Sequence, residues 1–294
     1  MDTKKNFKKI DVACSVSENE IKKVESWVIP SLLKQRGIES INLFLFNYTG
    51  EDNCVYKGEK HINNIKIIEI NKGRQSGFGE AHNYVFDYIK PESYWMILNP
   101  DVFLHEDCIW EMMNKIEECS KYGIVEARQL PFEHPKEYDK ISGETSWASG
   151  FCLLVRSDAF REVSGYDEGY WMYCEDVDLS WRLRMAGYKA IYCPEAVAYH
   201  FTGAFFEYNS SRYYLEHFWS SRNFLYLACK FFGKRGERKA KRLLNSTTYS
   251  ENFKQEVLSS YEKVKSTIPL DFSRNNKKKI KECGLKIYGF NHYN

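Results

Sequence analysis

Three carboxylates stand within four positions of the stretch WMYCEDVDLSWRLR, residues 171–184: Glu175, Asp176 and Asp178. Aromatic residues flank them on both sides, so we expect the acids to lie in a partly apolar setting. Neighbouring carboxylates in such a setting raise one another's pKa, which suits a general base. The alternative is structural, because acids favour a helix start and Asp178 and Arg182, four residues apart, would form an ion pair. We interpret the cluster as a candidate catalytic site, with Asp178 as a helix-start residue paired with Arg182.

A second candidate site ends the apolar run ILNPDV, residues 97–102. A buried strand that stops here would deliver Asp101, and with it Asn99, to the edge of a sheet. A carboxylate at that edge suits a hard divalent cation, which takes oxygen ligands and bridges to phosphates. An Asx-type turn explains the spacing equally well. His200 ends the later run PEAVAYH, where a structural role is expected unless the fold brings it to a metal.

A glycine pair precedes a predicted helix in RQSGFGEAHN, residues 74–83. Gly77 and Gly79 would let the backbone approach a ligand closely, and a helix N-terminus favours an anion. The stretch is not a GxGxxG motif, so an ordinary turn between loop and helix is the alternative.

Apolar periodicity predicts strands and helices in alternation, which indicates βαβ units and an α/β fold with a mostly parallel sheet covered by helices. The predicted strands are 8–17, 41–47, 64–70, 93–99, 147–156 and 188–200, and the predicted helices are 18–37, 79–90, 108–119 and 212–233. Such sheets bind ligands where their strands end. Ser15, Asn47 and Asp101 each lie at such an end, so we expect them to meet at one edge of the sheet.

From about residue 205 the pattern becomes helical and basic, so the simplest division is a catalytic domain, 1–203, and a helical C-terminal region, 204–294. Basic residues gather in GKRGERKAKR (233–242) and RNNKKKIKE (274–282). Solvated helix faces explain these runs, and peripheral contact with an anionic membrane surface is the alternative.

The bulk composition limits the class of protein. A net charge of +2 argues against an electrostatic nucleic-acid binder. The nine cysteines show neither metal-ligand spacing nor a disulfide framework, which favours a reducing compartment. Neither a signal peptide nor 18 consecutive apolar residues is evident, so we expect a cytoplasmic protein, peripheral on the inner face of the membrane if it contacts one.

Four segments together resemble the inverting glycosyltransferases of family 2, which adopt the GT-A fold. They are SGFGEAHN, LNPDV, ASGFCLLVRSDAF and VSGYDEGYWMYCEDVDLSWRLRMAGYKAIYCPEAVAYH, in the order and spacing of that family. The likeness covers about residues 73–203 and is greatest to the bacterial rhamnosyltransferase-like branch.

The resemblance implies a donor and metal role for several of these positions. Asp101 would be the main ligand of Mg²⁺ or Mn²⁺, with Asn99 at the first position of a DXD-type element and His200 as a further ligand. Asn47 takes the place at which many relatives carry an aspartate that binds the nucleotide base. The donor-binding residues implied in this way are Ser15, Asn47, Gly77, Phe78, Asn83, Asn99, Asp101 and Arg182.

The resemblance also implies that Asp176 is the catalytic base and that Glu175 contacts the acceptor or orients the site. Aromatic rings beside these acids would stack on sugar faces, with core packing as the alternative. The acceptor-binding residues implied are Trp147, Gly150, Tyr170, Trp171 and Tyr173.

The expected activity is transfer of a sugar from a nucleotide-diphosphate sugar, dTDP-rhamnose or a UDP-sugar, to a glycan or lipid-linked glycan hydroxyl, in cell-surface polysaccharide synthesis. A catalytically inactive relative that binds glycans or acts as a scaffold is the main alternative, because Asn99 replaces the first acid of the metal motif. A membrane or partner adaptor built on the basic helices is another. A sugar-1-phosphate nucleotidyltransferase would need a glycine-rich loop after the first strand, where CSVSENE has no glycine. The oligomeric state is left open.

Overall fold

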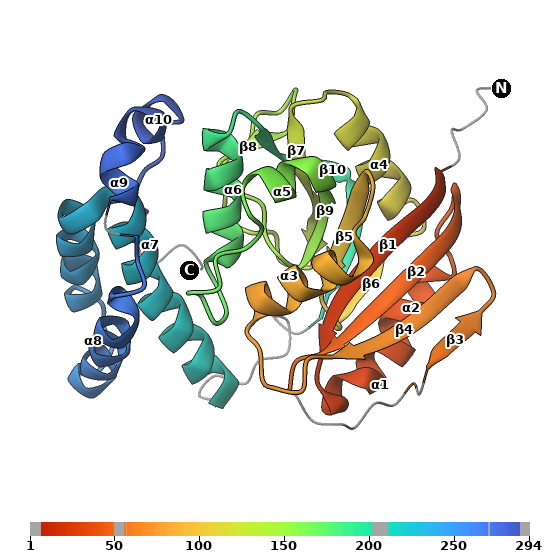
Figure 1. The fold of residues 1–294 in the computed structure, drawn as a ribbon, viewed down its shortest axis with the longest axis horizontal. Coiled ribbons are helices and arrows are strands. Elements are labelled where there is room, and N and C mark those ends of the chain that lie inside the picture. The colour runs from red at the N-terminus through yellow and green to blue at the C-terminus, as the bar shows by residue number, and fades with distance from the viewer. Residues whose placement is uncertain (1–6, 50–55, 57, 202–210, 270, 289–294) are drawn as a thin grey trace.

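The computed structural model describes residues 7–49, 56, 58–201, 211–269 and 271–288 (Figure 1). The predicted domain boundary at residue 203 lies outside these residues. Within them, one mixed sheet forms the centre of the N-terminal part, and helices cover both of its faces.

The sheet has the strand order β3-β4-β2-β1-β5-β9-β7-β10-β6, with β8 paired to β10. Its longest ladders, β1–β2, β2–β4 and β7–β10, are parallel, which confirms the predicted α/β fold. Strand β9 runs antiparallel between β5 and β7. The strands are β1 (Phe7–Val16), β2 (Ile38–Asn47), β3 (Glu59–Ile62), β4 (Ile65–Asn71), β5 (Tyr94–Leu98), β6 (Val102–Leu104), β7 (Tyr122–Leu130), β8 (Glu144–Thr145), β9 (Cys152–Arg156) and β10 (Lys189–His200).

The helices form a layer on each face of this sheet and a bundle at the C-terminal end (Figure 1). One face packs on η1 (Glu18–Glu20), α1 (Ile21–Lys23), η2 (Val24–Val28), α2 (Ile29–Leu32) and α4 (Cys108–Glu117). The other packs on α3 (Phe78–Ile89), α5 (Ser157–Glu162) and α6 (Glu175–Met185). The bundle contains α7 (Ser211–Asn245), α8 (Glu251–Lys265), α9 (Phe272–Asn275) and α10 (Lys277–Glu282).

Alternation along the central strands explains why both faces are covered. In β2, Leu43 and Leu45 pack on one face, and Phe44 and Phe46 pack on the other. Successive side chains of a strand point to opposite faces, so a strand that is apolar at every position must be buried on both. The sequence of the sheet therefore requires the two helical layers.

In the structure, the helical segment predicted for residues 18–37 is shorter than predicted, and its hydrogen bonding is irregular. The N–H of Ile29 bonds to the carbonyl of Val24, five residues back, and the following Pro30 has no N–H to continue the α-helical pattern. The helical segment ends at Leu32. The predicted strand 147–156 is also shorter in the structure, because only Cys152–Arg156 pairs with neighbours. Residues 147–151 form the loop that leads into it.

The C-terminal region is helical, as predicted, although helix 212–233 does not stop at its glycine. Gly233 has φ +58 and ψ −153, so the chain turns there and continues as helix to Asn245. The two parts of α7 pack with α8 and with the outer face of α6 around Trp181, Phe231 and Tyr261. In the part of the chain that the structure describes, no helix is long and apolar enough to cross a membrane.

Buried charges join α6 to α7. Asp178 is fully buried, and its carboxylate binds Arg182 on the same helix and Lys230 Nζ, 2.5 Å away on α7. Lys230 also lies 2.6 Å from Asp167 in the loop before α6. Burial alone would raise the pKa of Asp178, but the two cations outweigh it and lower the pKa. The predicted pair of Asp178 and Arg182 is confirmed, and Lys230 is a third member that the spacing did not indicate.

Replacing Lys230 with Met should destabilise the protein by about 3–5 kcal/mol, because two carboxylates lose a buried counter-charge. Urea denaturation followed by circular dichroism measures this change. Lys278→Met is the matched control, since the Lys278 side chain is 88% exposed and such pairs contribute about 0–1 kcal/mol. Equal stabilities for the two variants would show that Lys230 does not brace α6.

Candidate active site

The ends of six strands define one edge of the sheet. Strands β1, β2, β4 and β5 are mutually parallel, and because β9 is antiparallel to both β5 and β7, β7 and its parallel partner β10 point the same way. The ends of β5 and β10 therefore bring Asn99, Asp101 and His200 to the same side of the sheet.

Asp101 and His200 meet at this edge. Strand β6 pairs antiparallel with β10, so Val102 lies opposite His200, and His200 Nε2 is 3.2 Å from Asp101 Oδ1. The other ring nitrogen, Nδ1, lies 3.0 Å from Gln129 Oε1, and the ring stacks on Phe151. Both side chains keep a little exposure, 8% for Asp101 and 18% for His200. An imidazole and a carboxylate aimed at one point fit a divalent cation.

These two side chains offer only part of a metal site. No group of three His, Cys, Asp or Glu side chains in the described ranges could hold a metal ion. Asn99 lies beside the pair, and its N–H donates to the carbonyl of Phe151 at 2.9 Å. The donor set fits a cation that keeps some of its ligands from substrate or water, as magnesium does.

Asp176 lies in the first turn of α6, half-buried, with both carboxylate oxygens engaged. Oδ2 accepts the N–H of Gly150 at 2.9 Å, and Oδ1 accepts the N–H of Val177 at 2.8 Å. Burial raises the pKa of Asp176, although these two hydrogen bonds and the nearby His134 oppose the rise. A fixed, partly accessible carboxylate with a raised pKa has the properties of a general base.

Glu175 differs from Asp176 although it is the next residue. It is 5% exposed, and its Oε2 has no hydrogen-bond partner in the part of the chain that is described. Burial, followed by the charges of Asp176 and Asp178, raises the pKa of Glu175 well above its ordinary value. A buried acid whose pKa is raised by desolvation and by neighbouring carboxylates fits the predicted orienting role better than that of a base.

The segment Trp147–Phe151, which we call the connecting segment, joins the two halves of the site. Three successive N–H groups are fixed: Ala148 donates to Ser180 Oγ at 3.0 Å, Ser149 to Glu126 Oε2 at 2.8 Å, and Gly150 to Asp176. At its end, the carbonyl of Phe151 accepts from Asn99. Asp176 and the Asp101–His200 pair are therefore held by a single stretch of five residues.

Sequence reasoning missed the buried ionic cluster beneath this segment. Glu126 on β7 is fully buried, its carboxylate binds Lys136, and its Oε1 lies 3.6 Å from His134 Nδ1. Lys136 Nζ also lies 4.4 Å from the centre of the Trp147 ring. A glutamate in the middle of the apolar run GIVEARQL was the signal, since a charged residue is almost never fully buried without a partner.

The glycine stretch at α3 contacts the acid loop. The N–H of Phe78 donates to the carbonyl of Trp171 at 2.8 Å, and a Cβ at Gly77 would lie 2.5 Å from that oxygen. The Phe78 ring lies against the place where a Cβ of Gly150 would be, 3.4 Å away. The amide of Asn83 bonds to both backbone groups of Tyr166. These residues shape the loop before Asp176, and their contact with a donor stays a prediction.

Other positions named from the resemblance are spread along the site. Arg182 is bonded to Asp178 and to the carbonyl of Val163. Ser15 lies on β1 near the edge of the sheet, and Asn47 ends β2, where its Oδ1 accepts the Thr49 N–H at 3.1 Å in an Asx turn. Donor contact by these three residues also stays a prediction.

The four aromatic residues assigned to the acceptor differ in exposure. Tyr170 and Trp147 are 1% and 3% exposed, so core packing, the alternative reading, describes them. Trp171 and Tyr173 are half-buried and can reach a ligand. The Trp171 ring lies 6.3 Å from that of Trp219 on α7.

The backbone just before the acids is strained. Tyr173 and Cys174 have φ of +71 and +67, a region that costs side-chain-bearing residues about 1–3 kcal/mol each. Asn223 on α7 holds this turn, because its amide donates to the carbonyls of Met172 and Tyr173 at 2.6 and 2.8 Å. The C-terminal helices therefore support the geometry of the turn that precedes Asp176.

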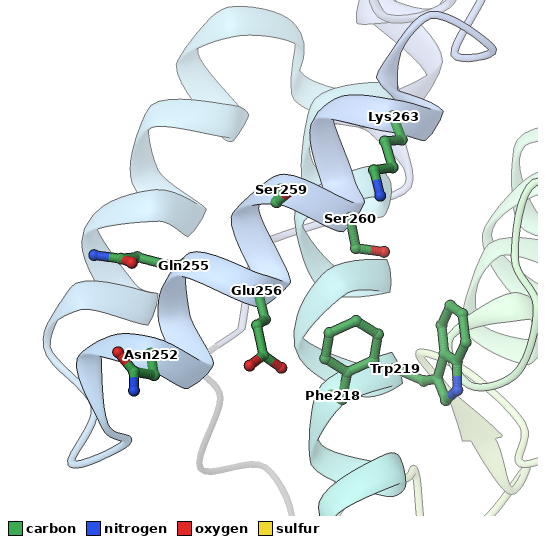
Figure 2. Close-up of a pocket in the computed structure, with 8 residues that line it drawn as sticks. All are labelled: Phe218, Trp219, Asn252, Gln255, Glu256, Ser259, Ser260 and Lys263. Atoms are coloured by element: carbon green, nitrogen blue, oxygen red, sulfur yellow. The ribbon is translucent and has the colours of Figure 1, made fainter.

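A separate cavity of about 660 Å³ lies between α7 and α8 (Figure 2). Figure 2 shows Trp219 extending from α7 toward the N-terminal part of the molecule, with Glu256 and Ser260 on the facing helix. The lining residues are Phe218, Trp219, Asn252, Gln255, Glu256, Ser259, Ser260 and Lys263. Neither Asp101 nor Asp176 lines it, so it is distinct from the site described above.

Comparison with known proteins gives sequence relatives that are named as rhamnosyltransferases. The chain is 27% identical to rhamnosyltransferase WbbL of Escherichia coli (strain K12), over 46% of this chain and 64% of that protein. It is 56% identical over 54 residues to the N-acetylglucosaminyl-diphospho-decaprenol L-rhamnosyltransferase of Mycobacterium tuberculosis, 18% of each chain. The chain thus spans less than two thirds of either relative. No family model matches it.

Among solved structures, the mannosyltransferase PcManGT from Pyrobaculum calidifontis, in complex with GDP-Man and Mn²⁺, has the same fold. The TM-score is 0.55 at 10% identity, and the match covers 94% of this chain and 76% of that one. The predicted GT-A architecture is therefore confirmed at the level of fold. Together with the sequence relatives, this match confirms that the chain resembles the glycosyltransferases, and among them the rhamnosyltransferases.

Proposed function

We propose that this protein is an inverting, metal-dependent glycosyltransferase that moves a sugar from a nucleotide-diphosphate sugar to a hydroxyl of a lipid-linked glycan, in cell-surface polysaccharide synthesis. The observation that carries the proposal is the connecting segment, which holds Asp176 on one side and the Asp101–His200 pair on the other. The names of the sequence relatives support dTDP-L-rhamnose as the first donor to test. A catalytically inactive relative is not favoured by these names.

Asp176 would remove a proton from the acceptor hydroxyl. The oxygen would attack the anomeric carbon from the face opposite the diphosphate, so that the C–O bond to the diphosphate breaks and the configuration inverts. Gly150 holds the carboxylate in place for this step through its N–H. Glu175, buried and with a raised pKa, would stay neutral and limit the negative charge around Asp176.

Asp101 and His200, with Asn99, are the residues that would hold the cation. A bound Mg²⁺ or Mn²⁺ would neutralise charge on the diphosphate leaving group. Half-buried Trp171 and Tyr173 lie beside the acids, where their rings can contact the acceptor sugar.

A lipid-linked acceptor would bring the protein to the inner face of a membrane. Exposed basic residues on α7 and α10 are available for contact with anionic headgroups, at about 1 kcal/mol for each Lys or Arg near the surface. They are Lys234, Arg235, Arg238, Lys239, Arg242, Lys277, Lys278, Lys279 and Lys281.

Nucleotide sugars should raise the melting temperature in a metal-dependent manner. A ligand at one hundred times its Kd stabilises the native state by about 2.7 kcal/mol. We would measure thermal unfolding with dTDP-rhamnose, UDP-glucose, UDP-galactose, UDP-N-acetylglucosamine and GDP-mannose, each with Mg²⁺, Mn²⁺ or EDTA. We expect dTDP-rhamnose to raise the melting temperature more with a cation than with EDTA. Stabilisation without transfer to an N-acetylglucosaminyl-diphospho-lipid would favour the inactive alternative.

Asp176→Asn should lower kcat by about 10²–10⁴-fold, because the amide cannot take a proton while its oxygen can still accept the Gly150 N–H. Donor Kd, measured by calorimetry, should be nearly unchanged. Asp158→Asn, an exposed acid at the start of α5, is the matched control. Normal turnover by Asp176→Asn would remove Asp176 from the role of base.

Asp101→Ala should weaken donor binding in the presence of Mg²⁺ or Mn²⁺ and leave the weaker, metal-free binding unchanged. The reason is that the carboxylate is the only anionic member of the proposed ligand set. Titrating the donor by calorimetry with and without cation separates metal-dependent donor binding from metal-free binding. His200→Ala should also weaken the metal-dependent binding. An unaltered response to metal in Asp101→Ala would place the cation elsewhere.

A further inference from the structure

We propose that Glu126 is a positioning residue for Asp176, acting through the connecting segment and through the two side chains beside it, His134 and Lys136. This inference rests on the proposed function of Asp176 as the base. It explains a buried ionic cluster that the transfer reaction itself does not require.

The first line of evidence is geometric. Glu126 Oε2 accepts the N–H of Ser149 at 2.8 Å, and the next N–H along the chain, that of Gly150, is the donor to Asp176 at 2.9 Å. Two consecutive peptide groups are thus fixed by two different carboxylates. Since Glu126 belongs to β7, an inner strand that pairs with β9 and β10, its hydrogen bond ties the connecting segment to the sheet.

The second line of evidence is the free-energy cost of burying the ion pair between Glu126 and Lys136. Glu126 is fully buried and the Lys136 side chain is 3% exposed, and a buried ion pair contributes little net stability compared with apolar residues of the same size. Lys136 Nζ also donates to the carbonyl of Trp147 at 3.2 Å, so Lys136 holds the start of the same segment. The hydrogen bonds that join the pair to the connecting segment therefore lie at Trp147 and Ser149, and Lys136 Nζ also lies 5.8 Å from the centre of the Tyr192 ring on β10.

The third line of evidence is electrostatic. His134 lowers the pKa of Asp176, Glu126 raises it, and Lys136 and Asp176 attract one another. The His134 ring lies between those of Trp147 and Phe151, and its Nε2 is 3.5 Å from Ser149 Oγ. The titratable groups that act on Asp176 or are acted on by it are Glu175, Glu126, His134, Lys136, Tyr166 and Cys174.

The test uses two single variants with opposite effects. Glu126→Gln keeps an oxygen for the Ser149 N–H but removes a negative charge, so the Asp176 carboxyl should titrate at lower pH. Lys136→Met removes a positive charge, so the same carboxyl should titrate at higher pH. The titration is followed by ¹³C NMR of aspartate side chains, with the Asp176 signal assigned by its loss in Asp176→Asn. This readout does not depend on transfer activity.

Steady-state kinetics with dTDP-rhamnose and an N-acetylglucosaminyl-diphospho-lipid provide the second readout. Glu126→Gln should lower kcat about 10-fold or more with little change in donor KM, and the acid limb of kcat/KM should move in the same direction as the NMR titration. Glu144→Gln is the matched control, because it removes one charge from a half-exposed ion pair on β8. Shifts in the same direction for Glu126→Gln and Lys136→Met, or none, would overturn the proposal.

The proposal can still be tested if one of the variants fails to fold. If Glu126→Gln fails to fold, the double variant Glu126→Gln/Lys136→Met takes its place, since it buries no unpaired member of the pair. Reduced kcat with retained donor KM in the double variant would support the positioning role, and wild-type kcat would contradict it. If the two variants show the expected NMR shifts but the wild-type chain transfers no sugar, the result would count against the proposed function and leave the positioning of Asp176 by Glu126 in place.

Discussion

The site depends on one topological constraint, the antiparallel insertion of β9 between β5 and β7. A strand that enters from the ligand edge must be preceded by a loop at that edge, and here the loop is the connecting segment. Its backbone N–H groups donate hydrogen bonds to the side chains of Ser180, Glu126 and Asp176. Its last carbonyl accepts a hydrogen bond from the N–H of Asn99. Backbone groups need partners when buried, so the same hydrogen bonds that allow the loop to be buried also fix the position of Asp176 relative to Asn99 and the Asp101–His200 pair.

The C-terminal helices contribute to the same geometry from the other side. Lys230 balances Asp167 and Asp178, and Asn223 caps the carbonyls of a turn in which Tyr173 and Cys174 adopt a left-handed backbone. Such a turn persists only where its surroundings over-determine it. The division of the chain at residue 203 therefore separates two parts that share a hydrophobic cluster and a set of buried charges, and it stays a prediction.

The three acids at positions 175, 176 and 178 carry the same carboxyl group, but their surroundings shift its pKa differently. Asp178 is buried against two cations, which lower its pKa, whereas Glu175 is buried with no ion pair among the described residues and has a raised pKa. Asp176, between them, keeps partial exposure and two backbone donors. Desolvation acts on all three, so the difference lies in what each carboxylate contacts.

The sequence by itself determined the fold class, the strand ends that carry Asp101 and His200, and the acid cluster, because these follow from local periodicity and from motifs along the chain. It also determined the Asp178–Arg182 pair, which needs only helical spacing. The tertiary structure alone decided which partners the acids have: Lys230 lies 52 residues from Asp178, and Glu126 lies 23 residues from Ser149. Contacts at such separations depend on strand order and helix packing, which no local pattern encodes, and they decide which carboxylates are paired with cations.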